Sequence, residues 1–158
     1  MFRDLRRFKQ AMTREECLEL LSSQRRGVLS VLGDGGYPYG VPMNYWYDPQ
    51  TGLICFHGAK EGHKQDALAR CDKVSFCVFD QGVRVGDDWP LHVKSVVIFG
   101  RVRVVENYER AMEICRALCC RFTDDRAYME REIQQAGPRV RCLELTVEHM
   151  SGKRVVES

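Results

Sequence analysis

Six short apolar runs, joined mostly by connections of hairpin length, constrain the fold of this chain more than any other feature. Neighbouring parallel strands would need a long crossover between nearly every pair, whereas antiparallel neighbours can be joined by a tight turn. The sequence therefore predicts a mainly β chain with helices, folded as a six-stranded antiparallel barrel. The six expected strands cover residues 28–32, 39–47, 53–57, 73–79, 91–105 and 139–147.

The first two strands carry signals for a turn and an irregularity. Residues 33–36, Gly-Asp-Gly-Gly, predict a tight reversal between them. Pro42 lies inside the second run, where it cannot donate a ladder hydrogen bond. We therefore expect a bulge or a sheet edge at Pro42.

Two helices are expected in the first half of the chain. Thr13 and Glu16 have the spacing of a capping box and precede apolar residues at helical intervals, and we expect Gly27 to end this helix. A second short helix is expected from near Gly62 to Arg70, directly after the third strand.

Two further helical stretches separate the fifth strand from the sixth. Residues 107–121 and 125–136 have helical spacing, with Asn107 as a plausible cap and Gly137-Pro138 as a stop. The helices are thus insertions in a strand-dominated chain.

Length and charge favour an ordinary globular domain. With 158 residues and a formal net charge of +2, we expect a single domain over 1–158, with an N-terminal arm and helix (1–25) and a helical insertion (107–136). This charge gives no reason to expect nucleic acid as a partner. The basic opening, residues 3–9, is a local exception, and it fits an amphipathic arm or a contact with RNA or a membrane.

The expected location is the cytoplasm. No apolar run approaches the roughly 20 residues that a membrane span requires, and the N-terminus has charges where a secretion signal has its apolar core. We expect no membrane partner. The eight cysteines are interpreted as reduced thiols, because residues such as Cys55 and Cys77 lie inside apolar strand-like runs.

The corner between the third strand and the second helix has the properties of an anion site. Gly58 and Gly62 allow the backbone to turn and to approach a ligand closely. The helix start presents unpaired N–H groups and a positive dipole end, and Lys64 adds a formal charge. This corner matches neither the P-loop nor the dinucleotide fingerprint.

Other polar residues are ambiguous. Asn44 within a strand needs partners for its amide, either a heteroaromatic ligand edge or other protein groups. His57 fits a structural role or a role in a site, and His63 is interpreted as solvated or facing a phosphate. A metal site made by Cys55, His57, His63 and Cys71 is an alternative, but it lacks a tight Cys or His pair, and we expect no metal.

Four segments would converge if the barrel closes as expected. They are the bulged second strand at 41–45, the loop 57–64, the fifth strand near Ser95, and the tail 151–153.

Two motifs carry a resemblance to a known family. Residues 56–64, Phe-His-Gly-Ala-Lys-Glu-Gly-His-Lys, and residues 95–102, Ser-Val-Val-Ile-Phe-Gly-Arg-Val, occur in a matching order and separation. With the segments around them, the chain resembles the nitroimidazole-resistance branch of the pyridoxamine 5'-phosphate oxidase-like FMN-binding split barrels. The resemblance spans nearly the whole chain and implies a split barrel of Greek-key type.

The resemblance also implies a homodimer with FMN in clefts at the subunit interface. His57 matches the histidine beside the flavin in that branch, where it would donate a proton to a substrate. The other implied cofactor contacts are Pro42, Met43 and Asn44 at the flavin ring, Gly58, Ala59, Gly62, His63 and Lys64 at the phosphate, and Ser95 and Val96 completing the cradle.

Two departures argue against a true pyridoxamine 5'-phosphate oxidase. In those enzymes the second strand carries basic residues and the C-terminal segment carries an arginine and a histidine, whereas residues 39–47 here contain no basic residue and residues 151–158 contain no histidine. The expected function is an FMN-dependent oxidoreductase that reduces nitro-aromatic or similar electron-poor small molecules. The alternative is a non-catalytic FMN-binding sensor or storage module.

Overall fold

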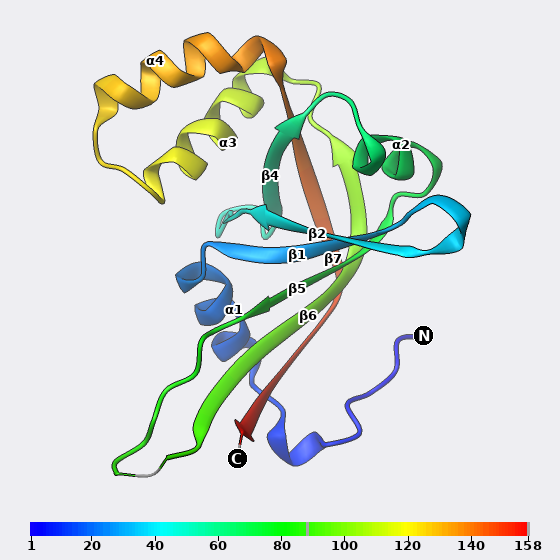
Figure 1. Ribbon diagram of the computed structural model, residues 1–158, viewed down its shortest axis with the longest axis vertical. Coiled ribbons are helices and arrows are strands. Elements are labelled where there is room, and N and C mark those ends of the chain that lie inside the picture. The colour runs from blue at the N-terminus through cyan, green and yellow to red at the C-terminus, as the bar shows by residue number, and fades with distance from the viewer. Residues whose placement is uncertain (88, 158) are drawn as a thin grey trace.

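The computed structural model describes residues 1–87 and 89–157, which form one curled antiparallel sheet with four α-helices (Figure 1). The strands are β1 (Arg26–Leu32), β2 (Pro38–Asn44), β3 (Trp46–Tyr47), β4 (Ile54–Ala59), β5 (Lys73–Phe79), β6 (Leu91–Val104) and β7 (Val140–Glu157). The helices are α1 (Arg14–Ser23), α2 (His63–Arg70), α3 (Tyr108–Cys120) and α4 (Arg126–Ala136), and 3-10 turns cover Phe8–Gln10, Asp34–Gly36 and Gly137–Arg139.

The sheet curls because its two edge strands are consecutive in the chain. The strand order is β2-β1-β5-β6-β7-β4-β3, and every described pair is antiparallel. Tyr45 alone separates β2, on one edge, from β3, on the other. The covalent chain thus joins the edges, which confirms the expected antiparallel split barrel. Pro42 lies on the edge strand β2, as its missing N–H predicts.

The prediction of six strands is wrong by one, because the run 39–47 is divided at Tyr45. The Tyr45 side chain is fully buried, and its hydroxyl donates a hydrogen bond of 2.7 Å to the backbone oxygen of Leu21 in α1. Its backbone N–H donates to the oxygen of Arg25 at 3.3 Å. These bonds direct the chain away from β1 and into pairing with β4.

The last strand is longer than the predicted run 139–147. It continues to Glu157 because the first half of the long β6 offers its backbone as a partner, with Leu91 opposite Glu157. A bulge accommodates the two long strands: Phe99 pairs with His149 and Gly100 with Val147.

Helix α1 closes one side of the main core. Its capping box is present, with the Thr13 hydroxyl accepting from the Glu16 N–H at 3.2 Å and the Glu16 carboxylate accepting from the Thr13 N–H at 2.8 Å. The helix ends at Ser23, so the expectation that Gly27 ends it is wrong. Gly27 lies in β1, where a Cβ atom would collide with the ring of Phe76.

The expected helical insertion covers the outer side of β4 and β7 (Figure 1). Asn107 and Asp125 cap α3 and α4 by accepting backbone hydrogen bonds of 2.8 and 3.0 Å. A second apolar cluster, separate from the main core, forms under α3; its buried members are Cys55, Met112, Ile114, Cys115, Leu118, Ile133 and Cys142. No helix in the described part of the chain is both long and apolar enough to cross a membrane.

A buried ion network fixes α3 to the barrel. Arg110 in α3 donates to Asp48 at 2.7 Å and to Glu144 at 2.8 Å, and both carboxylates are almost inaccessible to solvent. Arg103 also donates to Glu144 at 2.8 Å. Burial alone would raise the pKa of Asp48, but hydrogen bonds from Arg110 and Thr51 outweigh it and hold the pKa below its usual value.

Replacing Tyr45 by phenylalanine tests the closure of the sheet. The substitution removes the hydrogen bond to Leu21 and leaves a buried carbonyl oxygen without that donor, so we expect the free energy of unfolding to fall by about 1–2 kcal/mol. Urea denaturation measures the change. The matched control is Tyr47→Phe, because the hydroxyl of Tyr47 makes no hydrogen bond within the described residues. This control should change the free energy of unfolding by less than about 0.5 kcal/mol. Equal losses in both variants would contradict this interpretation.

Candidate functional site

The predicted anion corner lies where β4 ends and α2 begins. Gly62 precedes the helix with φ 118°, a backbone conformation that side-chain-bearing residues rarely adopt. Because α2 starts at His63, the amides of its first turn have no partner within the helix. Such a helix start favours an anion.

Lys64 supplies the charge at this corner. Its ammonium group lies 3.4 Å from the sulfur of Met43, and a Cβ atom on Gly58 would lie 2.9 Å from the same nitrogen. The missing side chain of Gly58 therefore makes room for the ammonium. Burial lowers the pKa of Lys64, and no carboxylate of residues 1–87 or 89–157 forms an ion pair with it. Lys64 is thus a half-buried cation that an anion would stabilise.

His57 is the titratable group next to this cation. Its side chain is exposed at the surface of the single chain, yet the protein atoms packed around its ring desolvate it enough to lower its pKa. The charge of Lys64 lowers the pKa of His57 further. At neutral pH the ring is therefore mostly uncharged.

His63 is engaged with the turn between β1 and β2. Its Nε2 accepts a hydrogen bond of 3.2 Å from the N–H of Asp34, and its ring stacks on Tyr39 with centroids 4.2 Å apart. Asp34 also receives a 2.7 Å hydrogen bond from Arg70 at the end of α2. These contacts hold the turn against α2.

Gln65 is a site residue that the sequence analysis missed. Its side chain is buried in the first turn of α2, and its Nε2 donates a 2.8 Å hydrogen bond to the backbone oxygen of Ala59 at the end of β4. This bond fixes the loop between the two elements. A glutamine in a short polar helix carries no sequence signal for such a contact, because its partner is a backbone atom.

The second-strand candidates lie on the edge of the sheet near Lys64. Met43 is buried, whereas Pro42 and Asn44 are exposed. The amide oxygen of Asn44 accepts a 3.3 Å hydrogen bond from Arg26 on β1, which leaves its NH₂ group available.

Ser95 and the tail meet each other, but not the anion corner of the same chain. Ser95 pairs with Lys153 in the β6–β7 ladder. The corner meets β7 far away, at the pair Ala59 and Val140, which is about 40 Å of extended strand from Lys153. The expected convergence of four segments therefore fails within one chain. Val96 is fully buried between β5 and β7, so it offers no exposed atom to a ligand in the single chain.

No three His, Cys, Asp or Glu side chains in the described ranges are placed to hold a metal ion. The alternative metal site therefore gains no support. Within that set, Cys55 is fully buried and 3.7 Å from Arg110, while His63 contacts the turn.

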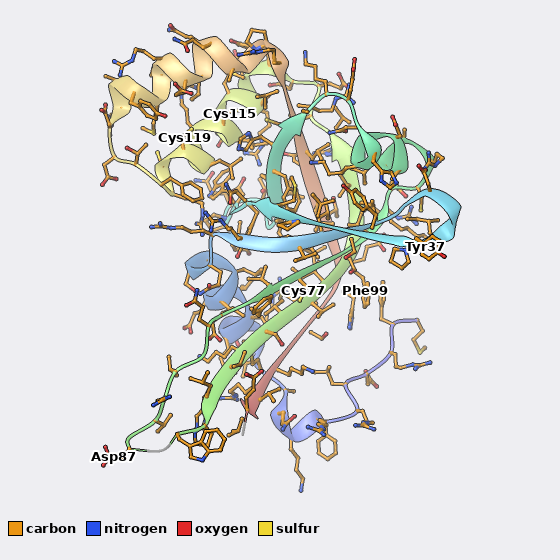
Figure 2. All side chains as sticks on the ribbon, in the orientation of Figure 1. Tyr37, Cys77, Asp87, Phe99, Cys115 and Cys119 are labelled. Carbon is orange, nitrogen blue, oxygen red and sulfur yellow. The ribbon has the colours of Figure 1, made fainter. Side chains whose placement is uncertain are left out.

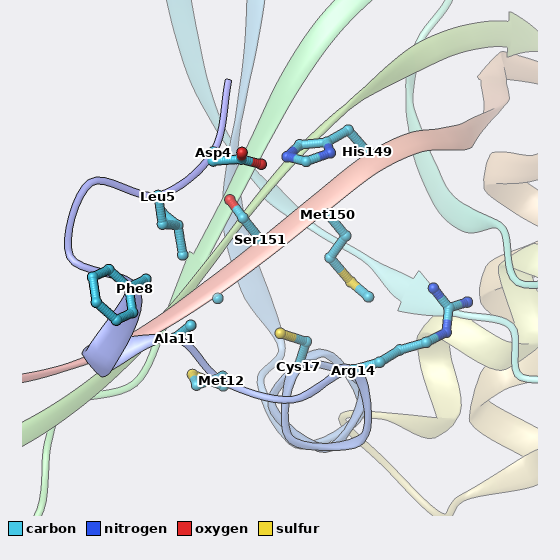
Figure 3. A pocket seen from close by; sticks show the side chains of 11 residues that line it. Asp4, Leu5, Phe8, Ala11, Met12, Arg14, Cys17, His149, Met150 and Ser151 are labelled. Atoms are coloured by element: carbon cyan, nitrogen blue, oxygen red, sulfur yellow. The ribbon is translucent and has the colours of Figure 1, made fainter. Parts of the chain in front are cut away.

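A cavity at the N-terminal arm lies away from the anion corner. It has a volume of about 480 Å³ and lies between the N-terminal arm and β7, bordered by Leu5, Phe8, Cys17 and His149 (Figure 3). None of the cofactor contacts predicted from the sequence lines this cavity. Since Lys64 and Gly62 provide the charge and the helix start that an anion requires, we take the corner as the candidate site, and it is open in the isolated chain.

Comparison with sequence families identifies a family for this chain. The model described as pyridoxamine 5'-phosphate oxidase matches residues 13–154, which include the whole candidate site. A comparison with curated proteins gives no match.

Solved structures share the fold across nearly the whole chain. A candidate 5-nitroimidazole antibiotic resistance protein from Bacteroides thetaiotaomicron aligns with a TM-score of 0.77 at 19% identity, over 93% of this chain and 87% of that one. A conserved hypothetical protein from Mycobacterium tuberculosis gives 0.77 at 21%, over 95% and 90%. A FAD-binding protein from Mesorhizobium loti gives 0.68 at 20%, over 92% and 97%. At these identities the likeness establishes the fold.

The coupling between Lys64 and His57 can be measured by NMR titration of the His57 ring. We expect a midpoint below the ordinary value of about 6.5. In Lys64→Gln the midpoint should rise, because the repulsion from the ammonium is removed, and it should stay below about 6.5 because burial is the larger cause. Lys60→Gln, which removes an exposed charge from the same loop, should leave the midpoint unchanged. Equal shifts in the two variants would contradict the coupling.

Proposed function

The chain belongs to the pyridoxamine 5'-phosphate oxidase-like family, and from that premise we propose that it is an FMN-binding flavoprotein. We further propose that it is a cytoplasmic oxidoreductase that reduces nitro-aromatic or similar electron-poor molecules. The single observation that carries the proposal is the half-buried Lys64 ammonium at the N-terminus of α2, without a carboxylate partner among the described residues.

The residues of the corner fit a phosphate monoester. A terminal phosphate carries up to two negative charges, and the α2 amides together with Lys64 would neutralise them. Gly58 and Gly62 keep side chains out of the space where the phosphate would approach the backbone. Pro42, Met43 and Asn44 would then border the flavin ring, with the free NH₂ of Asn44 as a donor to it. FMN ends in such a phosphate, which is why we favour it over FAD.

A homodimer would complete the site. The corner is open in one chain, and the predicted contact Ser95, next to the buried Val96, lies far from it, so a second subunit would have to supply Ser95. The outer face of β1, β5 and β6 offers a surface for such pairing. It exposes Phe79 and Phe99, and Val28, Cys77 and Val97 are partly exposed. Figure 2 labels Cys77 and Phe99 on this part of the sheet.

His57 is the proposed catalytic residue. Bound flavin would supply electrons to the acceptor, and the protein would supply orientation and a proton. An anion held by Lys64 would offset the positive charge that lowers the pKa of His57, so the ring would take up a proton more readily with the cofactor in place. His57 would then donate this proton to the reduced substrate.

Pyridoxamine 5'-phosphate is not the proposed substrate. The strands β2 and β3 carry no basic side chain, and residues 151–158 contain no histidine. A second phosphate at β2 and β3 would lack a counter-charge, and one at residues 151–158 would meet Lys153 and Arg154 but no histidine.

Flavin titration of the purified protein, with Lys64→Gln as the variant, tests the phosphate site. The loss of a charge-assisted hydrogen bond should weaken FMN binding roughly 10- to 100-fold. Riboflavin, which has no phosphate, should bind the variant and the wild-type protein almost equally. Lys60→Gln is the control for a general loss of charge.

Three results would decide against parts of this proposal. A wild-type protein that binds no flavin would overturn it entirely, and tighter binding of FAD than of FMN would overturn the choice of cofactor. If Lys64→Gln weakened the binding of FMN and of riboflavin equally, Lys64 would not be a contact of the phosphate.

The alternative function, a sensor or storage module without turnover, is separated by a single-turnover experiment. Bound flavin is reduced with dithionite and mixed without oxygen with a nitro-aromatic acceptor. For the oxidoreductase we expect reoxidation much faster than that of free flavin, and a loss of about 100-fold or more in His57→Ala with the flavin still bound. Reoxidation no faster than that of free flavin, over a panel of acceptors, would favour the sensor or storage module.

A further inference from the structure

Two buried thiols face each other between the helical insertion and the sheet. The sulfur of Cys115 in α3 lies 3.6 Å from the sulfur of Cys142 in β7. A disulfide bond is about 2.05 Å long, so the sulfurs must approach by about 1.5 Å, which rotation of two short side chains can largely supply. All eight cysteines have free thiols, including this pair.

Both thiols also line one cavity. It has a volume of about 330 Å³ and is bordered by Tyr108 of α3, Lys60 after β4 and Arg141 of β7. Tyr108 is largely exposed, so the cavity reaches the surface. A small polar molecule can therefore reach the pair although each cysteine is itself buried.

The environment differs between the two sulfurs. The hydrogen bond from Cys142 lowers the pKa of Cys115, and the charge of Arg116 acts in the same direction. Cys142 donates this bond, and the donation and its burial both raise the pKa of Cys142. Cys115 is thus the thiolate-forming member, which is the nucleophile in thiol oxidation, and Cys142 holds the proton.

We propose that Cys115 and Cys142 are a modification site, where a hydroperoxide small enough to enter the cavity oxidises the pair to a reversible disulfide. The Cys115 thiolate attacks the peroxide, the O–O bond breaks, and the sulfur becomes a sulfenic acid as water or alcohol leaves. The thiol of Cys142 then displaces the hydroxyl group as water and forms the S–S bond. In total two thiols lose two hydrogens, one peroxide is reduced, and a dithiol reductant reverses the change.

The other thiols of the insertion and its surroundings have different partners. Cys120 is exposed and lies 3.6 Å from the sulfur of Met129, which cannot form a disulfide. Cys55 contacts Arg110 at 3.7 Å, and burial raises its pKa to about 12, so it remains a thiol. Figure 2 shows Cys115 and Cys119 on the same helix α3, but Cys119 is not a member of the apolar cluster that contains Cys142.

The disulfide would act close to the candidate site. Cys142 pairs directly with His57 across the β4–β7 ladder, so both side chains lie on the same face of the sheet. Oxidation would bond α3 covalently to the strand next to His57. The inference does not depend on the proposed function, since it concerns the thiols whether or not flavin is bound.

Mapping of cross-linked peptides tests the proposal on the full chain. The protein is reduced, freed of reductant and treated with a small molar excess of hydrogen peroxide. We expect the free thiols to fall from eight to six and a peptide containing Cys115 joined to Cys142 to form, and dithiothreitol to reverse both changes. Oxidation of Cys120 without the Cys115–Cys142 peptide would overturn the proposal.

Two variants make the result specific. In Cys142→Ser the second step is blocked, so Cys115 should accumulate as sulfenic acid and react with dimedone. Cys120→Ser, on the same helix, should leave formation of the cross-link unchanged. A dimedone adduct that is absent from Cys115 and present on other cysteines would contradict the assigned nucleophile. The wild-type peptide map remains decisive if Cys142→Ser does not fold.

Discussion

The closure of the sheet through Tyr45 is the constraint on which the rest of this structure depends. The strand order places β2 and β3 on opposite edges, although one residue separates them, so the chain itself must close the curl. The buried Tyr45 ring and its hydrogen bond to α1 hold that crossing in place. The same crossing positions Met43, two residues before it, against Lys64 of α2. The candidate phosphate corner is therefore a product of how the barrel closes.

A phosphate site at this corner rests on features that protein folding alone would disfavour. A half-buried ammonium without a carboxylate partner in the described part of the chain costs free energy, and so does its position beside the positive dipole end of α2. Gln65 stabilises the loop without using up the charge of Lys64, since it bonds to a backbone oxygen. A bound anion would offset both costs, which links the stability of the corner to its proposed occupant.

Sequence patterns predicted the features that depend on neighbouring residues and missed those that depend on residues far apart in the chain. The strands β1 and β5 are short apolar runs, and the caps at Thr13 and Asn107 are complete within one helical turn, so short patterns sufficed. The break at Tyr45 depends on Leu21 and on β4, which no local pattern contains. The extension of β7 through a polar tail depends on the length of β6. The family resemblance supplied the split barrel, and the separation of Ser95 from the corner follows only from the three-dimensional register.

The ion network beneath α3 bears on how the insertion can diverge in sequence. A helix that docks only by apolar contacts can rotate among packings of similar energy. Arg110 allows α3 one rotational setting, because a rotation by a single residue would leave the buried carboxylate of Asp48 without a counter-charge and leave Glu144 with Arg103 alone. The orientation of α3 on the barrel is thus set by one guanidinium group. The apolar face of the helix can therefore accept substitutions without a change in that orientation.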